Sequence, residues 1–112
     1  MKYSLIFIFS TALIFAACLS EKEETLPEKD CPEAITFSGG VDQIINTNCA
    51  VPGCHVPGAV PPSLKGYDEV NSHTSNIEKR INGEGAIMPP SGKLPQATID
   101  SISCWIQNGK LR

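Results

Sequence analysis

The positions of five cysteines constrain this 112-residue chain more than any other feature of its sequence. Cys49 and Cys54 precede His55, with four residues between the two thiols. Cys18 closes an apolar segment at the N-terminus, and the other two cysteines lie near the two ends of the remaining chain. Cysteines used for cross-links or covalent attachment are typical of proteins outside the reducing cytoplasm. The pattern therefore indicates an exported protein.

The N-terminus has the features of an export signal. Lys2 is the only charged residue before position 21, and the segment 5–17 is apolar except at two positions. This run of about 13 residues is shorter than the roughly 20 that span a membrane as a helix. Because small residues precede Cys18, the segment resembles a bacterial lipoprotein signal, which is cleaved before Cys18 so that this cysteine carries lipid. Ordinary cleavage near Ala17, which would release a soluble periplasmic protein, is the alternative.

Three segments follow from this interpretation: a signal peptide at 1–17, a lipid attachment site with an acidic tether at 18–30, and a folded domain at 31–112. The tether has five acidic residues and two lysines, so it cannot bury apolar area. The domain has 7 acidic and 6 basic residues. This balance argues against nucleic-acid binding and against strong electrostatic steering of a partner. We expect a protein of the cell envelope, lipid-anchored to a membrane and facing the periplasm or the cell surface.

The folded domain is expected to be all-α, with about three short helices separated by long loops. Apolar residues recur at helical spacing in 37–45, in 76–81 before Gly83, and most clearly in 96–108. In the last segment, the apolar stripe comprises three isoleucines flanked by a tryptophan. Proline-rich loops such as 51–62 separate the helices, and no segment shows a strand pattern. Three short helices rarely close a core in a domain this small, so we expect a large group at its centre.

The run from Cys49 to His55 contains the groups that attach a c-type haem. Two thiols can add across the two vinyl groups, and an imidazole beside the second thiol can bind the iron. The usual spacer between the thiols is two residues, whereas here it is four. Because Pro52 cannot continue a helix and Gly53 accepts a positive φ, we expect the extra length to bulge outward. A local disulfide between Cys49 and Cys54, or half of a zinc site, is the alternative.

A second axial ligand for the iron is available at Met88. After removal of the signal peptide it is the only methionine, and it lies 33 residues beyond His55 in a loop stiffened by Pro89 and Pro90. Methionines more often fill gaps in a core, but this one lies outside any periodic stripe. Ligation by histidine and methionine raises the reduction potential and leaves no open iron position. This pair of ligands therefore favours an electron carrier over an enzyme.

Taken together, these features resemble the small class I cytochromes c, in particular the envelope group called planctomycete-type cytochrome c. The resemblance covers about residues 37–109 and rests on Asn46-Thr47-Asn48-Cys49, Cys54-His55, Met88-Pro89-Pro90 and the Trp105-Ile106-x-x-Gly109 ending of the last helix. It implies one haem c per chain, attached through Cys49 and Cys54 and ligated by His55 and Met88. It also implies that the His55 ring bonds to a loop proline carbonyl, for which Pro62 is the best match and Pro61 the alternative.

The resemblance further implies that the first and last helices cross beside the haem edge, which would bring Cys31 close to Cys104. A disulfide between them would close a loop of about 74 residues and contribute roughly 4 kcal/mol to stability through loop entropy. In the alternative arrangement, one of these two cysteines joins Cys49, Cys54 and His55 around a zinc ion.

The remaining polar residues form no catalytic pattern. His73 lies in the polar stretch 71–75 and is expected to be a surface histidine in a solvated loop; a second haem ligand or a zinc ligand is the alternative. We therefore expect a non-enzymatic monohaem cytochrome c that carries single electrons between redox partner proteins of the envelope. Two other functions stay open: a zinc- or disulfide-stapled lipoprotein binding module without haem, and a haem enzyme or gas sensor in which Met88 leaves the iron.

Overall fold

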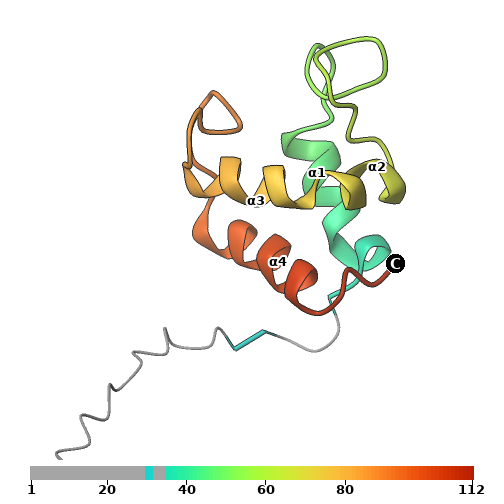
Figure 1. Cartoon of the computed structure of the whole chain (residues 1–112), viewed down its shortest axis with the longest axis vertical. Coiled ribbons are helices and arrows are strands. Elements are labelled where there is room, and N and C mark those ends of the chain that lie inside the picture. The colour runs from blue at the N-terminus through green and yellow to red at the C-terminus, as the bar shows by residue number, and fades with distance from the viewer. Residues whose placement is uncertain (1–29, 32–34) are drawn as a thin grey trace, which may run out of the picture.

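The computed structural model describes residues 30–31 and 35–112 (Figure 1). The expected signal peptide, the lipidation site at Cys18 and most of the tether lie outside these residues. The described chain contains no strand, which confirms the all-α expectation for this part of the protein. None of its helices is long and apolar enough to cross a membrane. Its elements are a π-helical turn, η1 (Phe37–Val41), followed by four α-helices: α1 (Asp42–Asn48), α2 (Tyr67–Ser72), α3 (Thr74–Asn82) and α4 (Gln96–Gln107).

The first helical segment, η1 with α1, forms where apolar residues recur at helical spacing. The hydroxyl of Thr36 caps its start by accepting a hydrogen bond of 2.9 Å from a backbone N–H in the first turn. Phe37, Val41 and Ile45 are all buried, although the helical geometry is interrupted at Gly40 between the first two of them. Cys49 follows Ile45 by four residues and is buried with them. The helix that packs the core therefore also delivers the first cysteine of the motif.

The last helix, α4, has the bounds that the sequence predicts to within one residue. Ile99, Ile102 and Trp105 are almost completely buried, whereas Ile106 is only half-buried. Trp105 therefore lies at the centre of the buried face, whereas the isoleucine spacing alone places it at the edge. Gly109, with φ of 85°, follows the helix and lets the chain turn back over it.

The middle of the chain departs from the prediction, because it contains two helices rather than one. α3 ends at Gly83 in the left-handed conformation, as expected, with Ile77 and Ile81 buried. α2 was not predicted, because a six-residue helix with Val70 as its single fully buried side chain has no detectable periodicity. The stretch 71–75 is therefore the junction of two helices and not a solvated loop, and the described part of the domain has four α-helices where about three were expected.

An aromatic cluster joins the two ends of the domain. The rings of Phe37, Tyr67 and Trp105 contact one another with centroid separations of 5.5, 5.8 and 6.2 Å. The carbonyl of Leu111 accepts hydrogen bonds of 2.8 Å from the Phe37 amide and from the Trp105 indole. The Tyr67 hydroxyl donates to the carbonyl of Lys110, also at 2.8 Å. These contacts hold η1, α2, α4 and the C-terminal segment together.

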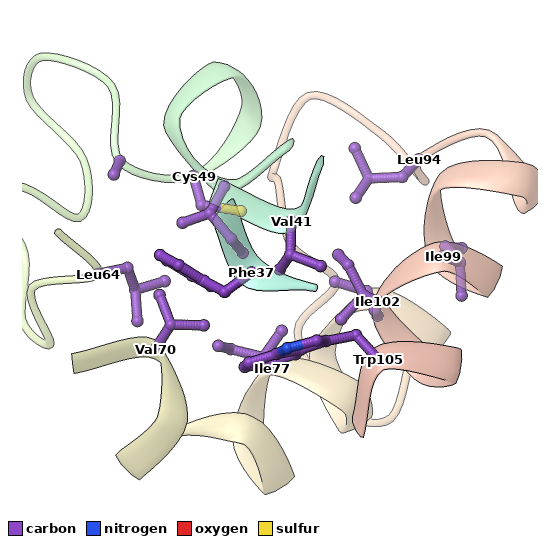
Figure 2. Close-up of a cluster of buried hydrophobic side chains, with 13 residues drawn as sticks. Phe37, Val41, Cys49, Leu64, Val70, Ile77, Leu94, Ile99, Ile102 and Trp105 are labelled. Atoms are coloured by element: carbon purple, nitrogen blue, oxygen red, sulfur yellow. The ribbon is translucent and has the colours of Figure 1, made fainter. Parts of the chain in front are cut away.

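A disulfide bond attaches the start of the domain to α4. Cys31 and Cys104 have their sulfurs 2.10 Å apart and their Cα atoms 5.2 Å apart. This is the pairing that the resemblance implies. Figure 2 shows that buried side chains from η1, α2, α3 and α4 point into one shared core, to which α1 contributes Ile45. In Figure 1, α3 and α4 lie side by side, while the loop after α1 projects beyond the helices.

Candidate functional site

The site begins where α1 ends, at Cys49. This residue is only 9% exposed and carries a free thiol, and its amide donates to the carbonyl of Ile45 at 2.9 Å. Burial raises the pKa of the Cys49 thiol to about 11, with a further contribution from the neighbouring thiol of Cys54. The Cys49 sulfur is therefore a neutral thiol at physiological pH. Its surroundings are those of the apolar core and not those of an activated nucleophile.

The four-residue spacer 50–53 bulges outward, as its composition predicts. Pro52 and Gly53 are exposed, and Gly53 has φ of 82°, a conformation that glycine adopts without strain. The ends of the spacer nevertheless stay together, because the amide of His55 donates to the carbonyl of Cys49 at 3.1 Å. The extra length is therefore absorbed in the exposed turn, and the histidine returns to the first cysteine.

The ring of His55 is oriented by the backbone of Pro62. Its Nδ1 lies 2.8 Å from the Pro62 carbonyl oxygen. A carbonyl oxygen can only accept, so Nδ1 carries the proton and the neutral ring has its lone pair on Nε2. The amide of Leu64 donates to the His55 carbonyl at 2.9 Å and closes this loop. The contact is made by Pro62 and not by Pro61, and it is the kind that orients histidines that bind metals.

Met88 is half-buried in the loop that follows α3. Its amide donates to the carbonyl of Arg80 at 3.2 Å, and the Nη1 atom of Arg80 donates to the carbonyl of Ala86 at 3.3 Å. Gly85 has φ of 82°, and because it has no Cβ the guanidinium of Arg80 can approach the backbone there. The end of α3 therefore determines where the methionine lies, through one backbone contact and one side-chain contact.

Two adjoining cavities bring these residues together. The larger has a volume of about 400 Å³ and the smaller about 110 Å³, and Cys49, His55 and Met88 line both. The second cysteine, Cys54, lines the smaller one. A cavity of several hundred cubic ångströms is of the size that holds a cofactor. Apolar walls are supplied to the larger cavity by Pro61, Pro62, Leu64, Ile77 and Ile81, and to the smaller one by Val60, Pro89 and Pro90.

His73, expected on the surface, instead lines the larger cavity. It is half-buried where α2 meets α3, and its Nδ1 donates to the carbonyl of Glu69 at 2.8 Å. Asn76 and Arg80 line the same cavity further along α3. His73 was considered for the site only as an alternative iron or zinc ligand, and Asn76 and Arg80 were not predicted to belong to it. The signal was present in their spacing of three and four residues, which they share with the buried Ile77, but it is recognisable only once 74–82 is known to be one helix.

The arrangement of the cysteines can be compared with the two alternatives to haem attachment, a local disulfide and a zinc site. Cys49 and Cys54 are free thiols and do not form a local disulfide. Cys31 and Cys104 bond to each other, so neither joins the motif as a zinc ligand. Across residues 30–31 and 35–112, no group of three or more histidine, cysteine or acidic side chains is arranged to hold a metal ion.

No protein-family model, curated protein or solved structure matches this chain. Its function must therefore be inferred from the residues of the site and from their geometry.

Proposed function

We propose that this chain is a monohaem c-type cytochrome that carries single electrons between redox partner proteins of the cell envelope. The observation that carries the proposal is the convergence of two free thiols, one imidazole oriented by a carbonyl and one thioether on two adjoining cavities. These four groups are the set needed for two thioether links and two axial iron ligands. The apolar walls around them suit a large planar hydrophobic group.

Each residue of the set has a defined role. Cys49 and Cys54 would hold haem c through thioether bonds, with the Nε2 atom of His55 and the sulfur of Met88 as axial ligands. When bound, haem supplies a one-electron Fe(III)/Fe(II) couple. The Pro62 carbonyl holds the His55 ring in place and increases its basicity as a ligand. A thioether ligand favours ferrous iron and so raises the reduction potential.

The same residues favour a carrier over an enzyme. If His55 and Met88 both bound the iron, no position would be left for a substrate or a gas. The set would also lack a free general base, since the imidazole of His55 would be committed to the iron and both thiols would be used in thioether bonds. A lipid on Cys18 would keep the domain at a membrane, where a high local concentration makes a weak and transient complex with a redox partner effective.

The test is an optical spectrum of the protein produced with a c-type haem maturation system, followed by denaturation and extraction with acidic acetone. We expect the haem to stay with the polypeptide and to give sharp low-spin bands when reduced. A weak far-red band from sulfur bound to ferric iron should disappear in Met88→Ala. The matched control is Ile87→Ala, which truncates the adjacent side chain of the same loop and should keep the band.

Three results would contradict the proposal. Haem that is extracted from the wild-type protein as easily as from a Cys49→Ala/Cys54→Ala double variant would exclude covalent attachment. Colourless protein containing zinc, or an additional disulfide, would support the stapled binding module. A high-spin spectrum with tight carbon monoxide binding would support a haem enzyme or gas sensor, because it requires an open iron position.

A further inference from the structure

We infer that one wall of the larger cavity, formed by His73, Asn76 and Arg80, binds carboxylates and holds the two propionate groups of the haem. This wall, called the α3 wall below, deepens the proposed function and rests on it. It assigns a role to three residues that take no part in covalent attachment or in iron ligation.

The α3 wall is continuous because its residues share one face of a helix. His73 stands immediately before α3, and Asn76 and Arg80 follow at intervals of three and four residues. Seven residues of helix rise by about 10 Å, which spreads the three side chains along one side of the cavity. Ile77 and Ile81 lie beside them and are buried. α3 therefore contributes apolar surface for a ring system together with polar groups at its border.

The chemistry of the α3 wall suits an anion. Arg80 has five N–H donors, and its recorded hydrogen bond, from Nη1 to the carbonyl of Ala86, uses one nitrogen. The amide of Asn76 adds two donors, and the His73 ring can donate from Nε2 when it is protonated. No aspartate or glutamate lines either cavity, and the first turn of α3 has no acidic residue. The helix dipole at this N-terminus also favours a negative charge.

The position of the α3 wall within the site identifies which carboxylates it binds. Cys54 lines the smaller cavity and not the larger, whereas His73, Asn76 and Arg80 line the larger and not the smaller. Haem carries its two vinyl attachment points and its two propionates on opposite edges of the ring. A haem joined to the cysteines therefore directs its propionates away from Cys54, toward the α3 wall. Carboxylates at the border of an apolar cavity require hydrogen-bond partners, and a guanidinium can bind them through two parallel bonds.

The experiment is redox-difference infrared spectroscopy of the holoprotein, with the haem carboxylates labelled with carbon-13. The variants are Arg80→Gln and Asn76→Val. The control is Lys79→Gln, which removes an equal charge from the same turn of α3 at a residue that is exposed, like Arg80, but lines neither cavity. We expect the labelled carboxylate bands to shift in both variants and to stay in place in the control. Arg80→Lys should shift them less than Arg80→Gln.

The reduction potential provides a second readout. A propionate that loses its cationic partner favours ferric iron, so Arg80→Gln should lower the midpoint potential more than Lys79→Gln does. The far-red band of Met88 ligation should be kept in this variant, because the guanidinium also contacts the Met88 loop and loss of the thioether would lower the potential too. A His73→Gln variant should shift the carboxylate bands and keep the low-spin spectrum. Loss of that spectrum would make His73 an iron ligand and overturn its place in the wall.

Two results distinguish the α3 wall from the covalent haem itself. Carboxylate bands that stay unchanged in Arg80→Gln and Asn76→Val, in a protein that retains covalent low-spin haem, would overturn the α3 wall and leave the cytochrome assignment intact. A wild-type protein that binds no covalent haem would overturn the proposed function, and the α3 wall with it.

Discussion

Removing the cross-link between Cys31 and Cys104 should destabilise the domain by an amount that can be calculated from the length of the loop. The two residues are 73 positions apart, so the disulfide encloses nearly the whole folded region. In the chain-entropy treatment, closing a loop of this length in the unfolded state contributes about 4.4 kcal/mol at 25 °C. That is a large share of the roughly 5–15 kcal/mol by which a small domain is stable.

Part of this effect should be offset in the folded state. From Phe37 onward the chain is held independently, through the hydrogen bond of the Phe37 amide to Leu111 and through the aromatic cluster. Without the disulfide, Cys31 itself can regain freedom in the folded state, at about 1 kcal/mol. We therefore expect a Cys31→Ala/Cys104→Ala variant to lose about 3 to 4 kcal/mol.

The assay is urea unfolding of the double variant and of the wild type, followed by circular dichroism and by the fluorescence of Trp105, the single tryptophan. With a slope of about 2 kcal/mol per molar, the midpoint should fall by about 1.5 to 2 M urea. Wild-type protein treated with a reductant should approach the variant, and the variant itself should not respond to the reductant. A loss below about 1 kcal/mol, with an unchanged slope, would refute the calculation, because it would show that the cross-link does not restrict the unfolded chain as assumed.

Three further predictions test separate contacts. Gly85→Ala and Gly83→Ala both place an alanine at positive φ, at a loss of about 1 to 2 kcal/mol, but only at Gly85 does the new Cβ come within 2.6 Å of the guanidinium of Arg80. Urea unfolding should therefore find Gly85→Ala the less stable of the two, and equal midpoints would show that the guanidinium moves aside freely. Tyr67→Phe removes the 2.8 Å hydrogen bond to the C-terminal segment but keeps the ring, so thermal unfolding should show a loss of about 1 kcal/mol; an unchanged melting temperature would mean that the bond contributes nothing net. In haem-free protein, burial raises the pKa of the Cys49 thiol from 9.0 to about 11. The folded state therefore favours the protonated thiol, and the free energy of unfolding that this preference contributes is present below pH 9 and is lost as the pH rises through 11. This loss, about 2.7 kcal/mol, should be missing from the pH dependence of Cys49→Ala, and parallel curves for the two proteins would contradict the burial of the thiol.

Much of the fold could be predicted from the sequence, because it depends on neighbours along the chain. The spacing of Ile99 and Ile102 indicates α4, and Gly83 marks the end of α3, since a left-handed residue is required there. The bulge at Pro52 and Gly53 is also local, because it follows from what these two residues can adopt. The proximity of Cys49 and His55 needs little more than the short chain between them.

Only the tertiary structure decided the features that depend on distant residues. α2 is too short to show periodicity, and packing of Val70 and Tyr67 against other elements stabilises it. The central place of Trp105 depends on Phe37 and on the C-terminal carbonyl that its indole meets. A helix stripe indicates which residues are apolar, but the partner elements determine which of them is at the centre.

The candidate site also contains some residues that the sequence predicts and others that only the tertiary structure places there. The sequence by itself predicted a site of Cys49, Cys54, His55 and Met88, since these residue types in this order are chemically distinctive, and the four residues line the two adjoining cavities. It could not place His73 in the cavity, because a histidine in a polar stretch has the same local signature whether it faces solvent or a cofactor. Its position depends on how α2 and α3 meet and on the packing of α3 against α4, and the second of these contacts joins residues that are far apart in the chain. Local composition specifies the groups that can react, whereas the packing of the helices specifies which of them share one cavity.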